Sequence, residues 1–190
     1  MTTTISVCKA ADLEALAELV NAAYRGLDGQ AGWTSEIDMV AGPRTTAATL
    51  AAEFDSSRDV TILGLRETGA LLACIRLEKT ADAQGKPACL IGMLAVRPGL
   101  QDRGLGRMML ERAEAEALGW GAGTARMTVV SVRDSLIAWY ERRGYRRTGE
   151  TEAFPYDDDR FGTPMRPDLA FVVLEKALLD KPAAELHAAG

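Results

Sequence analysis

One segment, residues 88–131, restricts the fold more than any other, because a strand, a glycine-containing turn, a helix and a second strand follow each other in it. Residues 88–96 are almost continuously apolar, as is typical of a buried strand. A helix is predicted from about Gly104 to the glycine-rich stretch 119–123. Its apolar residues recur every four positions, at Leu105, Met109, Ala113 and Ala117. Residues 126–131 are rich in β-branched side chains, so the segment predicts a βαβ crossover.

The remaining elements are predicted from apolar periodicity and turn residues. Further strands are expected at 5–8, 60–66, 71–79, 145–154 and 169–176, and further helices at 11–24, 45–54 and 134–143. This order predicts an α/β sandwich with a mixed, mostly antiparallel twisted sheet of about six to seven strands and helices on both faces. We expect one domain over residues 1–180 and a flexible C-terminal tail over 181–190.

Composition excludes several classes of protein. No apolar run approaches the roughly 18 residues of a membrane span, and the amino terminus MTTTIS lacks the features of a secretory signal. We therefore expect a cytoplasmic protein without a membrane partner. The net charge of −5 argues against a nucleic-acid partner. Local arginine clusters at 97–107 and 142–147 are nevertheless compatible with a small phosphorylated ligand.

The chain offers few side chains for metal binding or nucleophilic catalysis. Cys8, Cys74 and Cys89 are widely separated and form no CxxC pair, so neither a disulfide framework nor a metal site is predicted. The single histidine, His187, lies in the alanine-rich tail. A Ser-His-Asp or Cys-His mechanism would depend on that residue and is disfavoured.

The turn before the predicted central helix has the properties of an anion site. It comprises Gln101-Asp102-Arg103-Gly104-Leu105-Gly106-Arg107. Its two glycines allow the backbone to approach a ligand closely, and the opening turn of a helix presents unpaired N–H groups to an anion. The segment lacks the Gly-Lys-Ser/Thr of a Walker A loop and the third glycine of a Rossmann loop. Alternatively, the glycines merely permit a tight turn.

Two motifs resemble the GCN5-related N-acetyltransferase (GNAT) superfamily. Residues Gln101 to Gly106 resemble its Q/R-x-x-G-x-G/A signature, directly after a strand that ends Met93-Leu94-Ala95-Val96. The segment 138–145, AWYERRGY, is similar to the family's second motif, a short helix followed by a "GF"-like turn. The resemblance spans residues 5–176 and implies an acetyl-CoA-dependent acetyltransferase with splayed central strands.

By that resemblance, the cofactor contacts can be assigned to individual residues. Backbone groups of Leu94, Ala95 and Val96 are expected to pair with the pantetheine amides, and the turn from Gln101 to Arg107 to hold the pyrophosphate. An N–H near Leu94 is expected to stabilise the thioester oxygen as it gains charge. Asp134 and Ser135 are expected to cap the following helix, with Ser135 as a further contact to the CoA arm.

Tyr140 is the candidate general acid, because a phenol at this place can protonate the departing thiolate. The alternative is a core tyrosine whose hydroxyl is satisfied elsewhere. The strand at 90–93 carries no acid, which leaves Glu36, Asp38 and Glu78 as candidate bases, or a chain of water.

The acceptor is expected to be a primary amine of a small molecule or peptide. Trp33, Glu36 and Asp38 combine an aromatic ring with acids, a combination suited to a cationic amine, but they also fit a loop anchor with solvated acids. Tyr156 lies in an aromatic and acidic loop, 154–162, which either closes over the acceptor or contributes to a homodimer interface. A protein that binds acetyl-CoA without turnover is the alternative function.

Overall fold

The computed structural model describes residues 3–26, 35–158 and 162–178 of the chain. Seven strands form one sheet in the order β1-β3-β4-β5-β6-β9-β7, in which only the β5–β6 pair is parallel. The strands are β1 (Thr3–Val7), β3 (Val60–Glu67), β4 (Ala70–Ala81), β5 (Pro87–Val96), β6 (Thr124–Val130), β7 (Arg146–Ala153) and β9 (Ala170–Ala177). This mixed, mostly antiparallel sheet confirms the predicted fold class.

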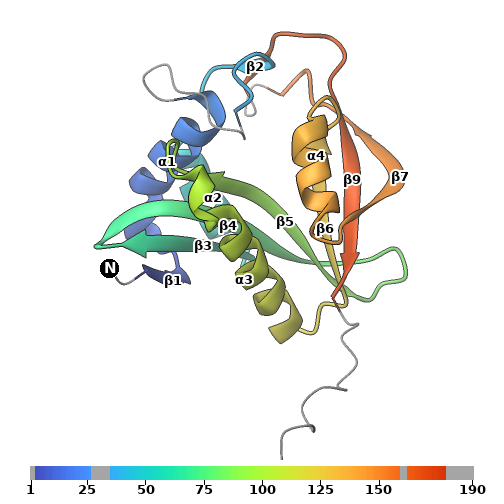
Figure 1. The fold of residues 1–190 in the computed structure, drawn as a ribbon, viewed down its shortest axis with the longest axis horizontal. Coiled ribbons are helices and arrows are strands. Elements are labelled where there is room, and N and C mark those ends of the chain that lie inside the picture. The colour runs from blue at the N-terminus through green and yellow to red at the C-terminus, as the bar shows by residue number, and fades with distance from the viewer. Residues whose placement is uncertain (1–2, 27–34, 159–161, 179–190) are drawn as a thin grey trace, which may run out of the picture.

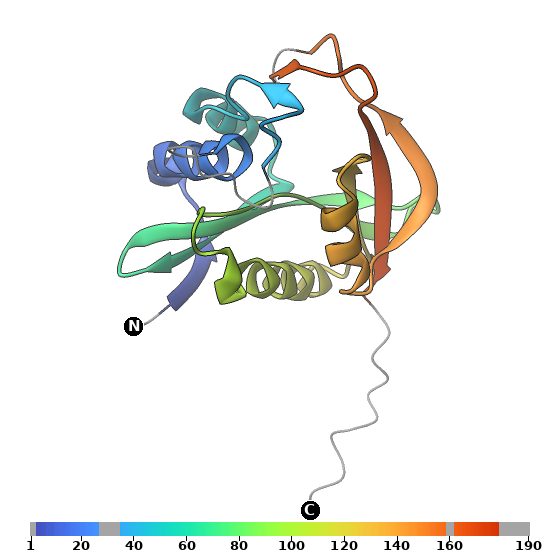
Figure 2. The same ribbon diagram turned by 45° about the horizontal axis from the view of Figure 1, so that its top comes forward.

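Helices cover both faces of the sheet (Figure 1, Figure 2). They are α1 (Leu13–Arg25), α2 (Ala47–Ser56), α3 (Leu105–Gly119) and α4 (Asp134–Glu141), with short 3-10 turns η1 (Ala10–Asp12) and η2 (Gln101–Arg103). Helices α1 and α2 lie on one face, and α3 lies on the other (Figure 2). Among the described residues, no helix is long and apolar enough to cross a membrane.

The central strands are buried on both faces because helices pack on each side of them. Successive side chains of a strand point to opposite faces. Ala95 of β5 therefore joins the apolar cluster under α1, whereas its neighbours Leu94 and Val96 join the cluster under α3. Burial on both faces explains why residues 88–96 are apolar without alternation.

The two central strands separate after a short stretch of pairing. Strands β5 and β6 pair only at Ala88↔Thr124, Cys89↔Ala125 and Leu90↔Arg126, and then diverge (Figure 1). On its other edge, β5 pairs with β4 through a bulge, where pairing passes from Cys74↔Ala95 directly to Arg76↔Gly92. Within this bulge Met93 has a φ of 48°, which is uncommon for a residue other than glycine.

Several local expectations differ from the structure. The sequence did not predict two short strands, β2 (Val40–Ala41) and β8 (Thr163–Pro164), which pair with each other. The N-cap of α4 is Arg133 and no side chain caps the helix, so the expected capping by Asp134 and Ser135 is wrong. The expected domain end at residue 180 and the tail 181–190 lie outside the described residues.

Gly64 of β3 provides a test of the packing between the sheet and the N-terminal segment. A Cβ at this position would lie 2.6 Å from Cys8 Sγ and 2.8 Å from Leu71 Cδ1, and both neighbours are buried. We expect Gly64→Ala to lower the free energy of unfolding by about 1–3 kcal/mol, the usual cost of overpacking a core. Chemical denaturation followed by circular dichroism measures this change.

The matched control is Gly119→Ala at the end of α3, where nothing lies within 4 Å of an added Cβ. It should leave the stability unchanged or slightly raise it, because alanine favours the helix over glycine. Equal stability of the two variants would contradict the packing described for Gly64.

Candidate active site

The divergence of β5 and β6 opens a cavity of about 310 Å³. Its walls come from residues 91–94 of β5 and 127–130 of β6. Tyr24 of α1 and Tyr140 of α4 also line it, together with four charged side chains, those of Glu36, Arg44, Arg133 and Glu152. We call this cavity the cleft. It is where the resemblance predicts the thioester to lie.

Tyr140 lies in the cleft within an aromatic cluster. Its ring meets those of Trp139 and Tyr145 edge-on, with centroids 5.0 and 5.8 Å apart. Its hydroxyl has no hydrogen-bond partner among the residues that the structure describes. Burial raises the pKa of Tyr140 well above its ordinary value, as does nearby Tyr24, whereas Arg133 lowers it. The phenol is therefore protonated at neutral pH and faces the space between the strands.

The bulge in β5 leaves backbone groups available at the floor of the cleft. Met93 and Leu94 oppose no residue of β4, and pairing with β6 has already stopped at Leu90. The Tyr24 hydroxyl donates a hydrogen bond to the Leu94 carbonyl, 3.3 Å away, which fixes one side of the bulge. Burial raises the pKa of Tyr24 to about 12, so this hydroxyl keeps its proton.

The turn before α3 has the backbone geometry of an anion site. Gly104 adopts φ 73° and ψ 9°, a left-handed conformation that glycine tolerates best. The Met108 N–H donates to the Gly104 carbonyl, 3.1 Å away, so the preceding amides at the helix start have no partner within α3. A cavity of about 160 Å³ adjoins this turn, and a Cβ at Gly104 would meet nothing within 4 Å. These features fit a pyrophosphate.

Basic and aromatic side chains from two helices line the same cavity. Arg107 comes from α3, and Trp139 and Arg143 come from α4 and the residues after it. The Arg143 guanidinium lies 3.5 Å from the centroid of the Trp139 ring and donates to the Trp139 carbonyl at 2.7 Å. Burial lowers the pKa of Arg143, as do Arg142 and Arg107. The positive charge of these arginines would stabilise a bound anion.

Residues 14–145 match the sequence model of the acetyltransferase (GNAT) family. The chain belongs to this family. It is an acetyl-CoA-dependent N-acetyltransferase, as the resemblance of its two motifs predicted. Among curated proteins, no sequence matches this GNAT acetyltransferase.

Solved structures support the fold. The ribosomal-protein-S18-alanine N-acetyltransferase of Escherichia coli superposes with a TM-score of 0.62 at 18% identity, over 96% of this chain and 98% of the other. YncA of Salmonella typhimurium, solved with its cofactor acetyl-CoA, gives 0.66 at 19% identity, over 97% and 98% of the two chains. The ribosomal-protein-alanine N-acetyltransferase of Brucella melitensis gives 0.66 at 16% identity, over 92% and 99%.

The predicted cofactor contacts of this GNAT acetyltransferase divide into two groups. Gln101, Asp102, Gly104 and Gly106 line the cavity at the turn beside Arg107, and Leu94 lines the cleft. Leu105 is buried in the core at that turn, while Ala95 and Val96 pair with β4, so only the edge of β5 that faces β6 is left for a ligand. Their roles toward acetyl-CoA stay predictions.

Two predicted cofactor residues lie elsewhere. The Arg103 guanidinium forms an ion pair with Glu67 of β3 at 2.8 Å, and the Arg103 N–H donates to the Leu100 carbonyl at 3.3 Å. Arg103 does not line the cavity at the turn, and its expected contact with the pyrophosphate stays a prediction. Ser135 is exposed on α4 and lines neither cavity.

Glu36 lies in the cleft but is held by arginines. It pairs with Arg25 at 2.9 Å and approaches Arg133 at 4.0 Å. Its carboxylate is thus held in an ion pair on the wall of the cleft. Arg133 is only 6% exposed, yet the sequence analysis did not single it out. The only local signal was its place between the end of β6 and the motif of α4.

The other candidate base and acceptor residues lie outside the cleft. Glu78 pairs with Arg76 at 2.9 Å and faces a second cavity. Asp38 is exposed, and Trp33 lies outside the described residues. The Tyr156 hydroxyl accepts from the Leu169 N–H at 2.7 Å, so it fastens its own loop instead of lining the cleft. The expected homodimer stays a prediction.

Gly104 tests the anion site through backbone conformation alone. A Cβ in the left-handed region costs roughly 1–2 kcal/mol, so Gly104→Ala should weaken CoA binding by about tenfold as the turn relaxes. Gly104→Asn is the control, because asparagine tolerates this conformation better and should bind CoA more tightly than the alanine variant. Isothermal titration with CoA gives the three dissociation constants. If all three are equal, the turn does not contribute to the site.

Proposed function

We propose that this acetyltransferase transfers the acetyl group of acetyl-CoA directly to a primary amine of a small molecule or peptide, with both substrates bound at once. The proposal depends on one observation: a protonated phenol, Tyr140, and the unpaired backbone of the β5 bulge face the same cleft. The turn that contains Gly104, the expected anion site, follows the end of β5 in the chain. A ligand with a diphosphate and a long amide-bearing arm can therefore occupy both.

The bulge supplies the groups that stabilise developing charge. When the amine attacks the thioester carbon, the carbonyl oxygen gains negative charge. The backbone amide at Leu94 belongs to no strand pairing and can donate to that oxygen. Donors that are already oriented in a water-poor site lower the barrier most, because they need no reorganisation during the reaction.

Tyr140 supplies the proton for the leaving group. As the carbon–nitrogen bond forms, the carbon–sulfur bond breaks and its electrons remain on sulfur. The Tyr140 hydroxyl donates a hydrogen bond and then a proton to this thiolate, which leaves as the thiol. The phenol regains a proton, and the attacking nitrogen loses one, so a neutral amine and acetyl-CoA give an amide and CoA.

Solvent is the proton acceptor in this proposal. Residues 90–93 of β5 carry no carboxylate, and Glu36 is engaged with Arg25. Glu152, the other carboxylate that lines the cleft, lies 3.8 Å from Arg126. An aliphatic amine with a pKa near 10.4 is mostly protonated at neutral pH, so only a small fraction is ready to attack. The acceptor must therefore lose its proton to water before or while it enters the cleft.

Two of the similar proteins are named for a protein acceptor. By their names, the Escherichia coli and Brucella melitensis enzymes acetylate an alanine of a ribosomal protein. Both kinds of acceptor, a peptide and a small molecule, are compatible with the cleft of this enzyme.

Tyr140→Phe should lower kcat by about 10²-fold or more, since proton transfer from a positioned side chain contributes roughly 10²–10⁴-fold. CoA affinity should change little. Release of the CoA thiol can be followed with a disulfide reagent. The background is low because burial raises the pKa of Cys8 and of Cys89 to about 11, and raises that of Cys74 further.

Tyr145→Phe is the matched control for this measurement. Its ring lies in the same aromatic cluster, but its hydroxyl donates to Glu114 at 3.1 Å and not toward the cleft. It should retain kcat within about twofold of the natural enzyme, an estimate from the small effect of residues outside the reacting centre. Equal losses in both variants would assign Tyr140 a packing role only.

The pH dependence follows from the raised pKa of Tyr140. The phenol acts in its protonated form, and a raised pKa moves the loss of that form to higher pH. Since an ordinary tyrosine has a pKa of about 10, kcat/KM should rise with pH as the amine deprotonates and show no descending limb below about pH 9.5. A descending limb in that range, present in the natural enzyme and absent from Tyr140→Phe, would contradict this assignment.

A further inference from the structure

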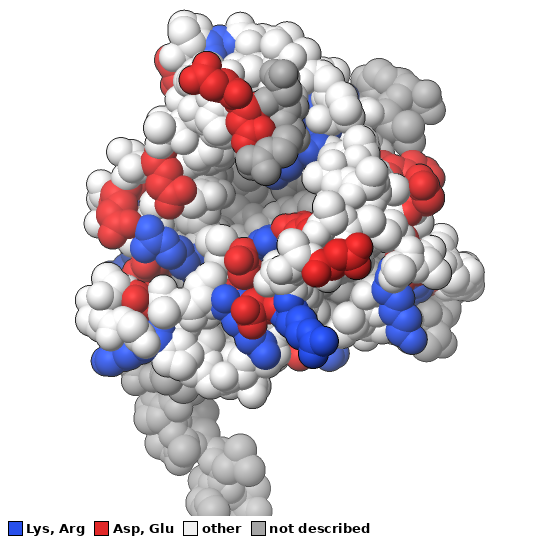
Figure 3. Space-filling view, turned by 180° about the vertical axis from the view of Figure 1, so that it is seen from behind, with Lys and Arg blue, Asp and Glu red and all other residues white. Residues whose placement is uncertain are grey.

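A second and larger cavity adjoins the cleft on the side of α2. It has a volume of about 920 Å³ and lies between α2 and the strands β4 and β5. Arg44, Gly92 and Met93 line both this cavity and the cleft, so the two spaces meet at these residues. Seen from behind, the molecular surface is hollowed near its centre, and acidic and basic side chains alternate below the hollow (Figure 3). We call the second cavity the side cavity.

Gly92 stands at the junction of the two spaces. It lies two residues before Leu94 on β5, and pairs with Arg76 of β4. A Cβ at Gly92 would have no heavy atom within 4 Å, so a side chain here would extend into open space. The absence of a side chain keeps the junction open.

The wall of the side cavity carries three linked charges. Arg76 of β4 donates to Glu53 of α2 at 2.6 Å and to Glu78 of β4 at 2.9 Å. The two carboxylate side chains are 30% and 32% exposed, whereas that of Arg76 is 17% exposed. These three side chains carry one net negative charge, and the two carboxylates are the more exposed of them. Arg44, the other charged residue of the lining, lies where the cavity meets the cleft and packs over the Tyr24 ring, 5.6 Å from its centroid. The part of the wall that carries Glu53 and Glu78 therefore favours a cationic ligand.

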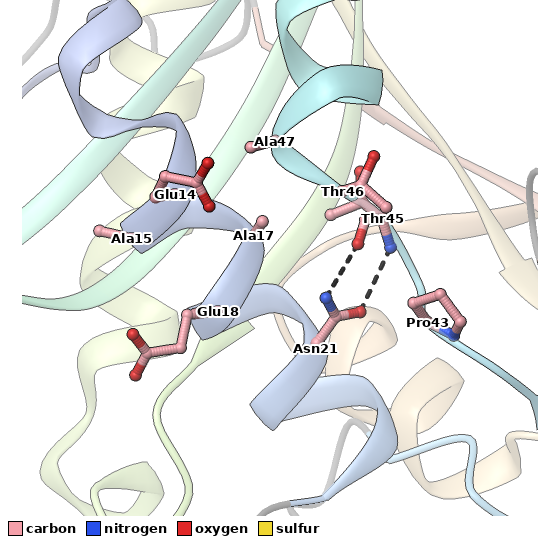
Figure 4. A pocket seen from close by; sticks show the side chains of 9 residues that line it. All are labelled: Glu14, Ala15, Ala17, Glu18, Asn21, Pro43, Thr45, Thr46 and Ala47. Atoms are coloured by element: carbon pink, nitrogen blue, oxygen red, sulfur yellow. Dashed lines mark hydrogen bonds between the residues drawn. The ribbon is translucent and has the colours of Figure 1, made fainter.

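A partly buried clamp holds the α2 wall in place. The Asn21 side chain of α1 accepts from the Thr45 N–H at 3.3 Å and donates to the Thr45 carbonyl at 2.9 Å (Figure 4). It also accepts from the Arg44 N–H at 2.6 Å. Thr46 then caps α2 by accepting from the Thr49 N–H at 3.0 Å. The segment that carries Arg44 and the start of α2 is therefore fixed relative to α1, and the side cavity has a defined shape.

We propose that the acceptor occupies the side cavity, that its reacting amine enters the cleft past Gly92, and that its far end is a cation bound by Glu53 and Glu78. This inference rests on the proposed function and specifies its substrate class. The acceptor is an elongated aliphatic amine with a second cationic group.

The strand register gives the length of this acceptor. Glu78 pairs with Leu90, which is four residues from Leu94 along β5. At about 3.3 Å per residue, the two ends of the acceptor site are roughly 13 Å apart. An acceptor whose amine and cation are separated by a chain of about eight carbons matches this distance, whereas a three-carbon diamine is too short to reach both ends.

The test compares amines of equal length with the intact enzyme. With acetyl-CoA, kcat/KM for 1,8-diaminooctane should exceed that for n-octylamine by about tenfold or more, the effect of one charge-assisted contact of about 1.5–3 kcal/mol. The kcat/KM for 1,3-diaminopropane should show no such excess over that for n-octylamine. Equal use of octylamine and diaminooctane would overturn the inference and leave the proposed function intact. Bound CoA without thiol release from any amine would instead overturn the proposed function.

Substitutions separate recognition of the cation from a role in proton transfer. Glu53→Gln and Glu78→Gln should each lower the preference for diaminooctane over octylamine by several-fold. Glu116→Gln, on the opposite face of the sheet in α3, is the control and should keep the natural preference. If Glu78→Gln lowers kcat for both amines in parallel and keeps the preference, Glu78 acts as a base and the inference fails.

Side chains of increasing size at position 92 test whether the acceptor passes this residue. Gly92→Ala and Gly92→Val should raise KM for diaminooctane progressively, about tenfold for valine, an estimate from the cost of misfitting a bound chain. The dissociation constant of CoA should change little, and valine is compatible with a strand. Unchanged KM in the valine variant would show that the acceptor does not pass this residue.

Discussion

The early end of the β5–β6 pairing is the constraint on which the site depends. A buried strand edge with unpaired backbone groups is costly, because each such group loses its hydrogen bonds to water. The sheet tolerates this edge since each strand is paired on its other side, β5 with β4 except at the bulge, and β6 with β9. The bulge at Met93 turns β5 away from β6, and Tyr24 satisfies the Leu94 carbonyl on one side. What remains is an edge suited to a ligand with amides of its own.

Burial around this edge also determines the protonation of the side chains beside it. Tyr24 and Tyr140 are shielded from water, which disfavours their phenolates and keeps both as hydrogen-bond donors. Arg133 at the cleft and Arg143 at the turn cavity lower the pKa of Tyr140 without reversing the shift. Glu36, on the wall of the same cleft, is paired with Arg25 at 2.9 Å and lies 4.0 Å from Arg133. Burial thus provides the cleft with a proton donor, while this carboxylate is engaged in ion pairs.

Local structure formed by neighbouring residues was predictable from the sequence. Contacts between side chains far apart in the chain were not. Gly104, Gly106 and the helix after them form one continuous segment, so apolar spacing and turn residues were sufficient to predict a glycine turn followed by a helix. The ion pair of Arg103 was not predictable, because its partner Glu67 precedes it by 36 residues and lies on β3. Likewise, Tyr156 contacts the backbone of Leu169. A single sequence does not reveal which charged residues form ion pairs in the fold. The buried Arg133 was overlooked for the same reason.

Gly92 links the lack of a base on β5 to the shape of the acceptor site. A carboxylate at this position could take a proton from the amine, but its side chain would extend into the space where the cleft and the side cavity meet. It would also stand opposite Arg76, where it would compete with Glu53 and Glu78 for the same guanidinium. A glycine leaves the array intact and the junction open, so water and a long acceptor can both reach the thioester. One residue without a side chain is thus the common basis of both proposals, solvent as the proton acceptor and an elongated acceptor.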